Sequence, residues 1–476
     1  MKGVLTLIAC LFAIISLEAQ TVTVSTDIPI RNDRYYSIVG KMKNRFLLFR
    51  DRANKFEVQA FNEELRQIWE KEITLDKKNP QILEVIPGRD QFTILYKFRH
   101  KGQYKIKMHR YDAAANLQDS ATVFTYEQRF HSPNTRLLYS EDKNAVLIYH
   151  YEQQTTLDAC AYLLDKMEIV WHRKFTLKDL SVYRDFQQLV LDNKGNLYCI
   201  IEKNNRRSNQ EEHNFQVYIS DPYTQGIRKF NIPFPEFLTY DVKFSYDNLN
   251  NKLIAAGLYS KKNKGRASGY FFLRVDPDNP KAHLLKSEPF DPEFISNFLG
   301  KDSEKKKGIT DLSIVELILR RDGGMLIAAE RKREYERRMA STGRYTREDY
   351  SPYIVDYYYD DICLISVHPD GETHWKTVLH KKQYSQDDDA SFSSFFLLKT
   401  PRNLRFLFND EIKDNSTVSE YVVNGRGYAD RNSVMSTEFQ NIRLRFRDAL
   451  QVASNELIVP SERRNRLRLV RVRYPK

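Results

Sequence analysis

The segment FEVQAFNEELRQIWEKEITL, residues 56–75, has two counterparts later in the chain. They are ACAYLLDKMEIVWHRKFTL (159–177) and ICLISVHPDGETHWKTVL (362–379). Each begins with a short apolar strand, continues through a polar turn and then starts a second strand with a tryptophan. The only three tryptophans of the protein, Trp69, Trp171 and Trp375, all lie at this point. The pattern predicts a repeated antiparallel sheet, in which the tryptophan rings pack against neighbouring sheets as scaffold.

The same unit can be followed through the whole chain. Eight times, a tight polar turn is followed by an apolar strand, and most of these turns contain Asp, Asn or Gly, which tolerate the positive φ of a hairpin turn. The eight apolar strands are residues 45–51, 91–98, 145–151, 196–203, 252–260, 325–331, 404–410 and 456–462. Four antiparallel strands per unit at such a spacing are typical of a β-propeller, so we predict an all-β fold of four-stranded blades.

The two ends of the chain predict how the ring closes. The last unit supplies only three strands and ends at residues 466–474, whereas the N-terminal segment 21–30 is a single strand without a partner nearby. Adding that strand to the last blade completes the blade and removes an exposed sheet edge. We therefore predict eight blades. Seven is the alternative, if the poorly patterned stretch 433–453 does not belong to a blade of its own.

The first nineteen residues have the pattern of a secretory signal peptide. Lys2 is followed by an apolar run from Val4 to Leu17 and by a plausible cleavage site before Gln20. We expect export to a periplasmic, outer-membrane-associated or extracellular location. Residues 20–476 are expected to form one propeller domain without a transmembrane segment, since no later stretch has eighteen consecutive apolar residues.

Insertions are expected around the sixth blade, at residues 290–311, 331–361 and 381–393. Residues 331–350 contain EYERRMAS, which is rich in helix formers, so a charged helix is predicted there.

No sequence motif in the chain indicates a catalytic residue, a metal ligand or a cofactor-binding site. There is no phosphate-binding loop, zinc-protease helix or nucleophile elbow. Cys160, Cys199 and Cys363 each lie in an apolar strand, where a free cysteine packs as a small hydrophobic residue. The histidines at 368, 374 and 380 and the acidic run 387–389 are interpreted as a charged strand edge and a solvated loop.

The turn that carries tryptophan resembles the repeat of eight-bladed pyrroloquinoline-quinone-type propellers. That family contains dehydrogenases and non-catalytic scaffolds of envelope assembly. The best local match is Asp370-Gly371 before Trp375. The other copies lack the Thr-Gly step of the family, and the adjacent cysteine pair of the dehydrogenases is absent. The resemblance therefore implies the fold and no cofactor residue.

Charge is expected to gather on one face of the propeller. Connections from the second to the third strand, and from one blade to the next, emerge on the same face, and nearly all long connections are of these types. The protein has a formal net charge of +12, and basic side chains recur in these long connections. The candidate ligand-binding residues are Lys261, Lys262, Lys264, Arg266, Arg337, Arg344, Tyr345 and Arg347. The last blade adds Arg463, Arg464 and Arg466 from its own turn.

Arginine clustered with tyrosine suits an anionic partner. We therefore predict an exported, non-catalytic propeller that binds an acidic glycan, a lipid headgroup of the envelope or an acidic partner protein. Nucleic acid is not an expected partner, because the chain is expected to be exported. The alternative is a carbohydrate-active enzyme, a polysaccharide lyase or a glycoside hydrolase, with its site in the central funnel. The opposite face is expected to be acidic, although tight turns favour Asp and Asn whatever the function.

Overall fold

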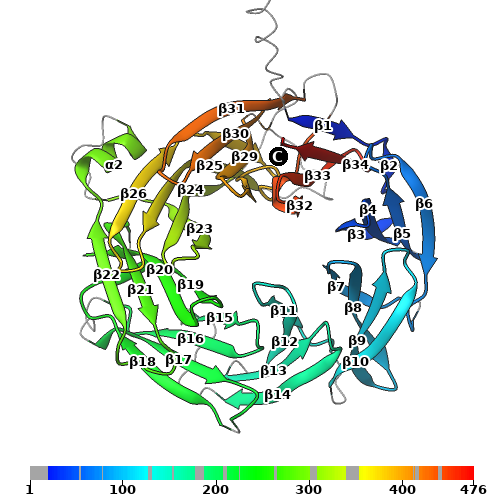
Figure 1. Cartoon of the computed structure of the whole chain (residues 1–476), viewed down its shortest axis with the longest axis horizontal. Helices are drawn as coiled ribbons and strands as arrows, with labels where there is room; N and C mark the ends of the chain where they lie inside the picture. Colours follow the sequence, from blue (N-terminus) through cyan, green and yellow to red (C-terminus); the bar gives the residue numbers. More distant parts are fainter. Residues whose placement is uncertain are drawn as a thin grey trace, which may run out of the picture.

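The apolar strands of the repeat form eight separate antiparallel sheets arranged as a ring (Figure 1). The computed structural model describes residues 20–475 except 53–54, 78, 127–130, 153–154, 177–186, 207–211, 225, 262–264, 301–307, 339–352, 411, 413–416 and 438–441. The expected signal peptide therefore lies outside the described residues. The predicted all-β propeller with eight blades is confirmed, and seven blades are excluded.

Blades 1 to 4 follow one another along the chain. Their strands are β3 (Asp33–Met42), β4 (Arg45–Arg52), β5 (Lys55–Phe61) and β6 (Gln67–Ile73) in blade 1; β7 (Gln81–Pro87), β8 (Gln91–His100), β9 (Gln103–Asp112) and β10 (Leu117–Tyr126) in blade 2; β11 (Arg136–Tyr139), β12 (Ala145–Glu152), β13 (Thr156–Leu163) and β14 (Glu168–Thr176) in blade 3; and β15 (Gln187–Leu191), β16 (Leu197–Lys203), β17 (Asn214–Ser220) and β18 (Arg228–Pro233) in blade 4.

Blades 5 to 7 continue the ring, and blade 8 combines the two ends of the chain. Their strands are β19 (Leu238–Asp247), β20 (Lys252–Ser260), β21 (Gly269–Val275) and β22 (Leu284–Pro289) in blade 5; β23 (Leu312–Leu319), β24 (Met325–Arg338), β25 (Tyr353–Val367) and β26 (Thr373–Leu379) in blade 6, with β27 (Gln383–Gln386) added to β25; β28 (Phe396–Lys399), β29 (Asn403–Asn409), β30 (Thr417–Asn424) and β31 (Ala429–Ser436) in blade 7; and β32 (Leu450–Ala453), β33 (Glu456–Arg463), β34 (Arg466–Arg473), β1 (Thr21–Val24) and β2 (Ile28–Pro29) in blade 8.

The N-terminal strand closes the ring as predicted. β1 pairs antiparallel with β34, with Val22 opposite Val472, and β2 continues the pairing with Ile28 opposite Leu467. Figure 1 shows β1 in dark blue beside β34 in dark red. The side chain of Ile28 is buried against blade 1, so the closing strand also contributes to the hydrophobic core.

Each blade is a simple meander, which sorts its connections between two faces of the ring. The connections from second to third strand and from blade to blade emerge on one face, here called the long-loop face. The other connections emerge on the opposite face, here called the turn face. The first strands, such as β3, β7 and β11, lie toward the centre of the ring, and the fourth strands, such as β6 and β14, lie at its rim (Figure 1).

Side chains on neighbouring blades form the core, and the tryptophans contribute to these contacts. Trp171 is buried at the rim of blade 3, and its Nε1 donates a hydrogen bond to the carbonyl oxygen of Gly195 in the turn between β15 and β16, at 2.8 Å. Trp375 makes the equivalent bond from blade 6 to Gly425 in blade 7, at 3.1 Å. Trp69 packs against a cluster shared by blades 1 and 2. The predicted scaffold role of the tryptophans is confirmed.

The cysteines behave as core residues. Cys160, Cys199 and Cys363 are buried and free. Burial raises the pKa of each of their thiols to about 12. Such thiols remain protonated at neutral pH and are poor nucleophiles or metal ligands.

The prediction of a helix at residues 331–350 is wrong for the part of this segment that the structure describes. β24 continues as a strand to Arg338 and pairs with the tyrosine-rich start of β25, with Lys332 opposite Tyr359 and Arg338 opposite Tyr353. Pairing with a partner strand has overridden a helix propensity that is weak by itself. Residues 339–352 lie outside the described part. The extended ends of β24 and β25, joined by β27, are called the blade 6 arm below.

The insertion before blade 6 contains a helix that the sequence did not predict. α2 (Pro292–Leu299) is capped by the Asp291 carboxylate, which accepts a hydrogen bond from the backbone N–H of Phe294. Its apolar residues Phe294, Ile295 and Phe298 pack on the core of blades 5 and 6. None of the helices described is long and apolar enough to cross a membrane.

Acidic and amide side chains of the turn face organise the turns themselves. The Asp112 carboxylate accepts hydrogen bonds from the backbone N–H groups of Ala114 and Asn116, at 2.9 Å each. Asp192 does the same between β15 and β16, and Asn424 does so between β30 and β31. A side chain that accepts from residues two and four positions ahead stabilises a tight turn. Many acidic residues of the turn face therefore have a structural role.

Candidate functional site

Two of the four basic residues predicted in blade 5 can be placed, and both lie where the sequence predicted. Lys261 and Arg266 are exposed in the connection from β20 to β21, on the long-loop face. Next to them, Ala267 bridges to Ile309, which fixes the end of this connection to the insertion before blade 6. Lys262 and Lys264 lie outside the described residues.

The predicted residue of the blade 6 arm is already paired. The Arg337 guanidinium forms an ion pair with Asp356 on the neighbouring strand, and the hydroxyl of Tyr384 donates to the same carboxylate at 2.8 Å. The bond from Arg337 and that from Tyr384 hold the pKa of Asp356 below its usual range. This ionised carboxylate offsets the charge of Arg337. Arg344, Tyr345 and Arg347 lie outside the described residues.

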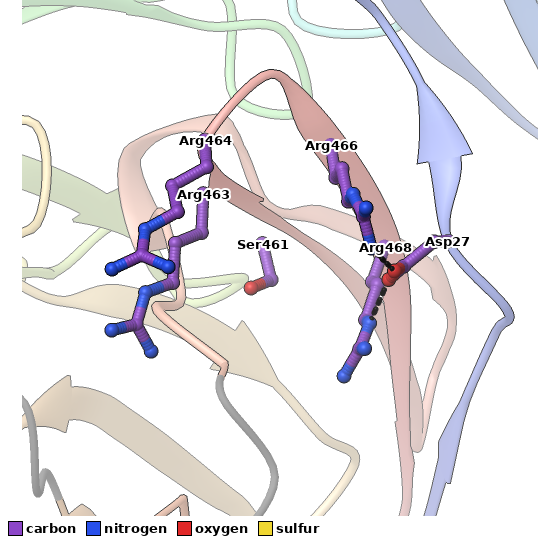
Figure 2. A pocket seen from close by; sticks show the side chains of 6 residues that line it. All are labelled: Asp27, Ser461, Arg463, Arg464, Arg466 and Arg468. Atoms are coloured by element: carbon purple, nitrogen blue, oxygen red, sulfur yellow. Dashed lines mark hydrogen bonds and ion pairs between the residues drawn. The ribbon is translucent and has the colours of Figure 1, made fainter.

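A denser group of arginines lies at the turn of the closing blade (Figure 2). Arg463 at the end of β33 pairs with Arg466 at the start of β34, and Ser461 pairs with Arg468. Residues opposite each other in an antiparallel pair share a face of the sheet, so this register puts their side chains on the same side. With Arg464 and Asp27 they line a cavity of about 330 Å³. Arg463, Arg464, Arg466 and Arg468 are called the arginine cluster below.

Local backbone geometry explains the position of the cluster. Arg464 and Asn465 have φ of 49° and 60°, so β33 and β34 are joined by a two-residue turn with two left-handed residues. Such a tight turn fixes the register of β33 and β34, which places Arg463 opposite Arg466. The turn joins a second to a third strand, so the cluster lies on the long-loop face.

One carboxylate joins the cluster to the N-terminal segment. Asp27, between β1 and β2, accepts hydrogen bonds from Arg468 and from Arg466, the latter at 2.8 Å. These two hydrogen bonds lower the pKa of Asp27. It therefore stays ionised and partly neutralises the cluster. Four of the six residues that line the cavity are arginines, so its lining is predominantly basic.

A larger cavity of about 650 Å³ lies on the other side of the same turn, toward the centre of the ring. It is bordered by β3, by Glu84 of β7 and by a short 3-10 helix, η3 (Phe446–Asp448). Within it, Glu462 accepts a hydrogen bond from Tyr36 at 3.1 Å and one from Arg445 at 2.6 Å. Arg445 also pairs with Asp448 at 2.7 Å. Cationic and anionic groups are mixed in this cavity.

Burial dominates the acid–base properties of the central cavity. It raises the pKa of the Glu84 carboxyl. It also raises the pKa of the phenols of Tyr35 and Tyr36, and for Tyr36 the nearby charge of Glu462 adds to the effect. These tyrosines are therefore protonated at neutral pH, and Tyr36 is held in place as a hydrogen-bond donor.

The three histidines near blade 6 do not form one cluster. His368 and His374 lie together on the turn face, with ring centres 4.5 Å apart. His380 lies at the other end of β26 and faces Asp361 at 3.6 Å. In the acidic run, the Asp388 carboxylate accepts from the backbone N–H of Ala390, which organises the loop after β27.

Sequence reasoning found the turn of the last blade but missed Arg468 and Asp27. Arg468 could have been found from the alternation in RLRLVRVR (466–473), which places it two residues from Arg466 on the same face of the strand. Asp27 has no such signal. Its place beside the arginines depends on the register in which the two ends of the chain pair.

Comparisons with known proteins agree with the fold and identify no family. No protein-family model matches the chain, and no curated protein matches its sequence. Among solved structures, the β-propeller domain of the trilobed protease of Pyrococcus furiosus has 11% sequence identity and a TM-score of 0.35; the match covers 84% of this chain and 97% of that one. The Nup133 β-propeller domain of Vanderwaltozyma polyspora has 8% identity and a TM-score of 0.38, covering 82% and 100%.

A third similar structure is dipeptidyl peptidase 4 of Porphyromonas gingivalis, with 9% identity and a TM-score of 0.45. The match covers 90% of this chain but only 56% of that protein, so this chain spans little more than half of its length. At such low identities these likenesses concern the propeller architecture alone.

Proposed function

We propose that this propeller is an exported, non-catalytic protein that binds an acidic glycan through its long-loop face, with the arginine cluster as the centre of the binding surface. The observation that carries the proposal is the composition of the cavity in Figure 2, whose lining contains four arginines and one carboxylate, that of Asp27. Guanidinium groups bind carboxylate and sulfate with paired, charge-assisted hydrogen bonds.

The geometry also supports a polymer rather than a single small anion. The cavity is open, and Lys261 and Arg266 add exposed cations elsewhere on the same long-loop face. A chain that carries an acidic group on many sugar units can contact several of these cations at once. Binding through several weak contacts raises the total affinity without requiring one deep pocket.

The expected result of the binding test is a large loss of retention when the arginine cluster is neutralised. Arg463, Arg464 and Arg466 are replaced together by Ser, and binding to an immobilised sulfated or uronate polysaccharide is measured at several salt concentrations. Each exposed charge pair contributes up to about 1 kcal/mol, so we expect the affinity to fall on the order of tenfold to a hundredfold. The dependence on salt is also expected to become weaker.

A matched control removes the same charge from the turn face. Arg321, Arg402 and Arg426 are exposed in turns of that face, and their triple replacement by Ser changes the net charge equally. Retention of this control is expected to stay close to that of the unmodified protein. Equal losses in both triple variants would mean that only net charge matters and would refute a defined site. Vesicles with anionic lipid and an acidic peptide serve as competing ligands, and preference for either would reject the glycan.

A second candidate function is a lyase or hydrolase acting on an acidic polysaccharide. It is favoured by the central cavity, where the raised pKa of Glu84 suits a proton donor and Tyr36 is held protonated beside Arg445. Incubation with a panel of acidic polysaccharides separates the two functions. Released products that disappear in Glu84→Gln would establish the enzyme and reject the non-catalytic role.

A further inference from the structure

A second polar cluster lies on the long-loop side of blade 3, away from the arginine cluster. It comprises His150 and Glu152 at the end of β12, Asp158 at the start of β13, and His172 and Lys174 on β14. The strand register places His150 opposite Asp158, and Asp158 opposite Lys174. All five side chains therefore lie on the same face of the blade, which is turned toward blade 2.

The cluster has the composition and spacing of a metal site. The ligand atoms of His150, Glu152 and Asp158 all lie within 4.8 Å of one another. His150 Nε2 is 3.3 Å from Glu152 Oε1. Zinc bonds of about 2.0–2.2 Å place tetrahedral ligand atoms roughly 3.4 Å apart, so small side-chain movements would suffice to bring the three groups around one ion.

The surroundings fix these side chains before any ion binds. His150 and Asp158 are nearly buried, with side chains 3% and 5% exposed. The ring of Tyr126 from blade 2 packs edge-on against His150 with centres 4.8 Å apart, and Phe124 packs at a tilt against His172 at 4.7 Å. His172 Nε2 is within hydrogen-bond distance of Asp158 Oδ1, at 2.7 Å. An apolar wall and a hydrogen-bonded carboxylate are the supports that protein metal sites typically have.

Lys174 offsets part of the negative charge of the cluster when no metal ion is bound. Its ammonium group lies 3.5 Å from Glu152 and 3.7 Å from Asp158. The side chain is 52% exposed, so it can swing into solvent at little cost. In the metal-free protein, Lys174 supplies a positive charge beside the two carboxylates. A bound metal ion would supply that charge instead.

We propose that blade 3 binds one divalent transition-metal ion of the zinc class through His150, Glu152 and Asp158, with His172 positioning the Asp158 carboxylate. One imidazole and two carboxylates form a mixed nitrogen and oxygen ligand set, which suits zinc, cobalt or manganese better than calcium. Three protein ligands leave a coordination position for water. The ion would link the second and third strands of blade 3.

The experiment titrates the chelator-treated full-length mature protein with zinc and, separately, with cobalt. Calorimetry is expected to show one high-affinity zinc ion per chain, and cobalt is expected to give the visible absorption of a low-symmetry site. His150→Ala should abolish this binding. His172→Ala should weaken it by roughly 10- to 100-fold, as is typical when a residue that supports a ligand is removed. Lys174→Gln should tighten it by on the order of tenfold, because a competing charge is removed.

The matched control is His368→Ala combined with His374→Ala, which removes the histidine pair of the turn face. Binding is expected to be unchanged in this variant. Absence of stoichiometric binding in the unmodified protein would overturn the proposal, and so would binding lost in the control or kept in His150→Ala. Lys174→Gln alters an exposed side chain and does not depend on the core, so failure of this variant to bind more tightly would also contradict the site.

Discussion

Glu330→Ala is expected to destabilise the protein by about 3–5 kcal/mol, because it leaves the charged group of Lys381 buried without its counter-ion. The two side chains are fully buried, at 0% exposure each, and their charged atoms are 2.7 Å apart. Denaturant unfolding followed by tryptophan fluorescence measures the loss. The pair lies at the base of the blade 6 arm, so the arm is expected to lose protection from hydrogen exchange first.

The large effect follows from the buried polar groups that surround the ammonium group of Lys381. This ammonium group forms an ion pair with Glu330 and donates hydrogen bonds to the carbonyl oxygen of Tyr359 at 2.9 Å and to the side-chain oxygen of Gln383 at 2.8 Å. Glu330 in turn accepts from the hydroxyl of Ser394 at 2.7 Å. Removing one member leaves an uncompensated charge in a low-dielectric site. Replacing Glu330 and Lys381 together by Met is expected to cost less than Glu330→Ala alone.

The loss of folding stability caused by Glu330→Ala is expected to become smaller as pH rises. Burial lowers the pKa of Lys381, and without Glu330 that effect is no longer opposed by the nearest carboxylate. The unfolded chain then binds more protons than the folded protein, so stability rises with pH toward the ordinary range of lysine, about pH 10. The surface pair of Lys399 and Glu316, 3.5 Å apart and half exposed, is the control. Glu316→Ala should cost less than about 1 kcal/mol, and an equal cost for both variants would contradict this explanation.

Deletion of residues 20–30 is expected to produce the second large effect, a loss of about 5 kcal/mol together with self-association. The segment supplies β1 and β2, and the deletion removes the buried side chains of Ile28 and Ile30 from the core. Each buried isoleucine contributes roughly 1.5–3 kcal/mol. The deletion also leaves β34 as an exposed edge strand, which can pair with other chains. Thermal unfolding and analytical ultracentrifugation measure the two effects.

A synthetic peptide of residues 20–31 added to the truncated protein provides the control. It is expected to restore both the monomeric state and most of the stability, because it can pair with β34 in the native register. Ile28→Val, which keeps the strand and removes one methylene, should cost only about 0.5–1.5 kcal/mol. A truncated protein that stays monomeric and as stable as the full chain would show that closure by this strand contributes nothing.

Most of the fold could be predicted from the sequence because the repeat is written into local patterns. The turn residues before each second strand and the three tryptophans locate the blades, and the unpaired segment 21–30 predicts the closure seen between Val22 and Val472. Helix propensity failed at residues 331–338, because the tyrosines of β25 offer a partner strand that a local reading cannot evaluate.

The candidate site was less predictable, since it depends on which side chains meet across the ring. The sequence indicated the arginines of the last turn but could not place Asp27 beside them, as these residues lie at opposite ends of the chain. Nor could it show that Arg337 is neutralised by Asp356, since that pair depends on the register of β24 with β25. Charge counted along a loop therefore overestimated the free charge of the arm.

The most direct test of the proposed binding face is hydrogen exchange with and without a sulfated oligosaccharide. We expect the ligand to slow exchange at the turn between β33 and β34, residues 462–468, and in neighbouring connections of the long-loop face. Exchange in the turns at 320–324 and 424–428 should not change. Protection confined to those turns of the opposite face, or no protection at residues 462–468 under saturating ligand, would rule out the arginine cluster as the glycan-binding site.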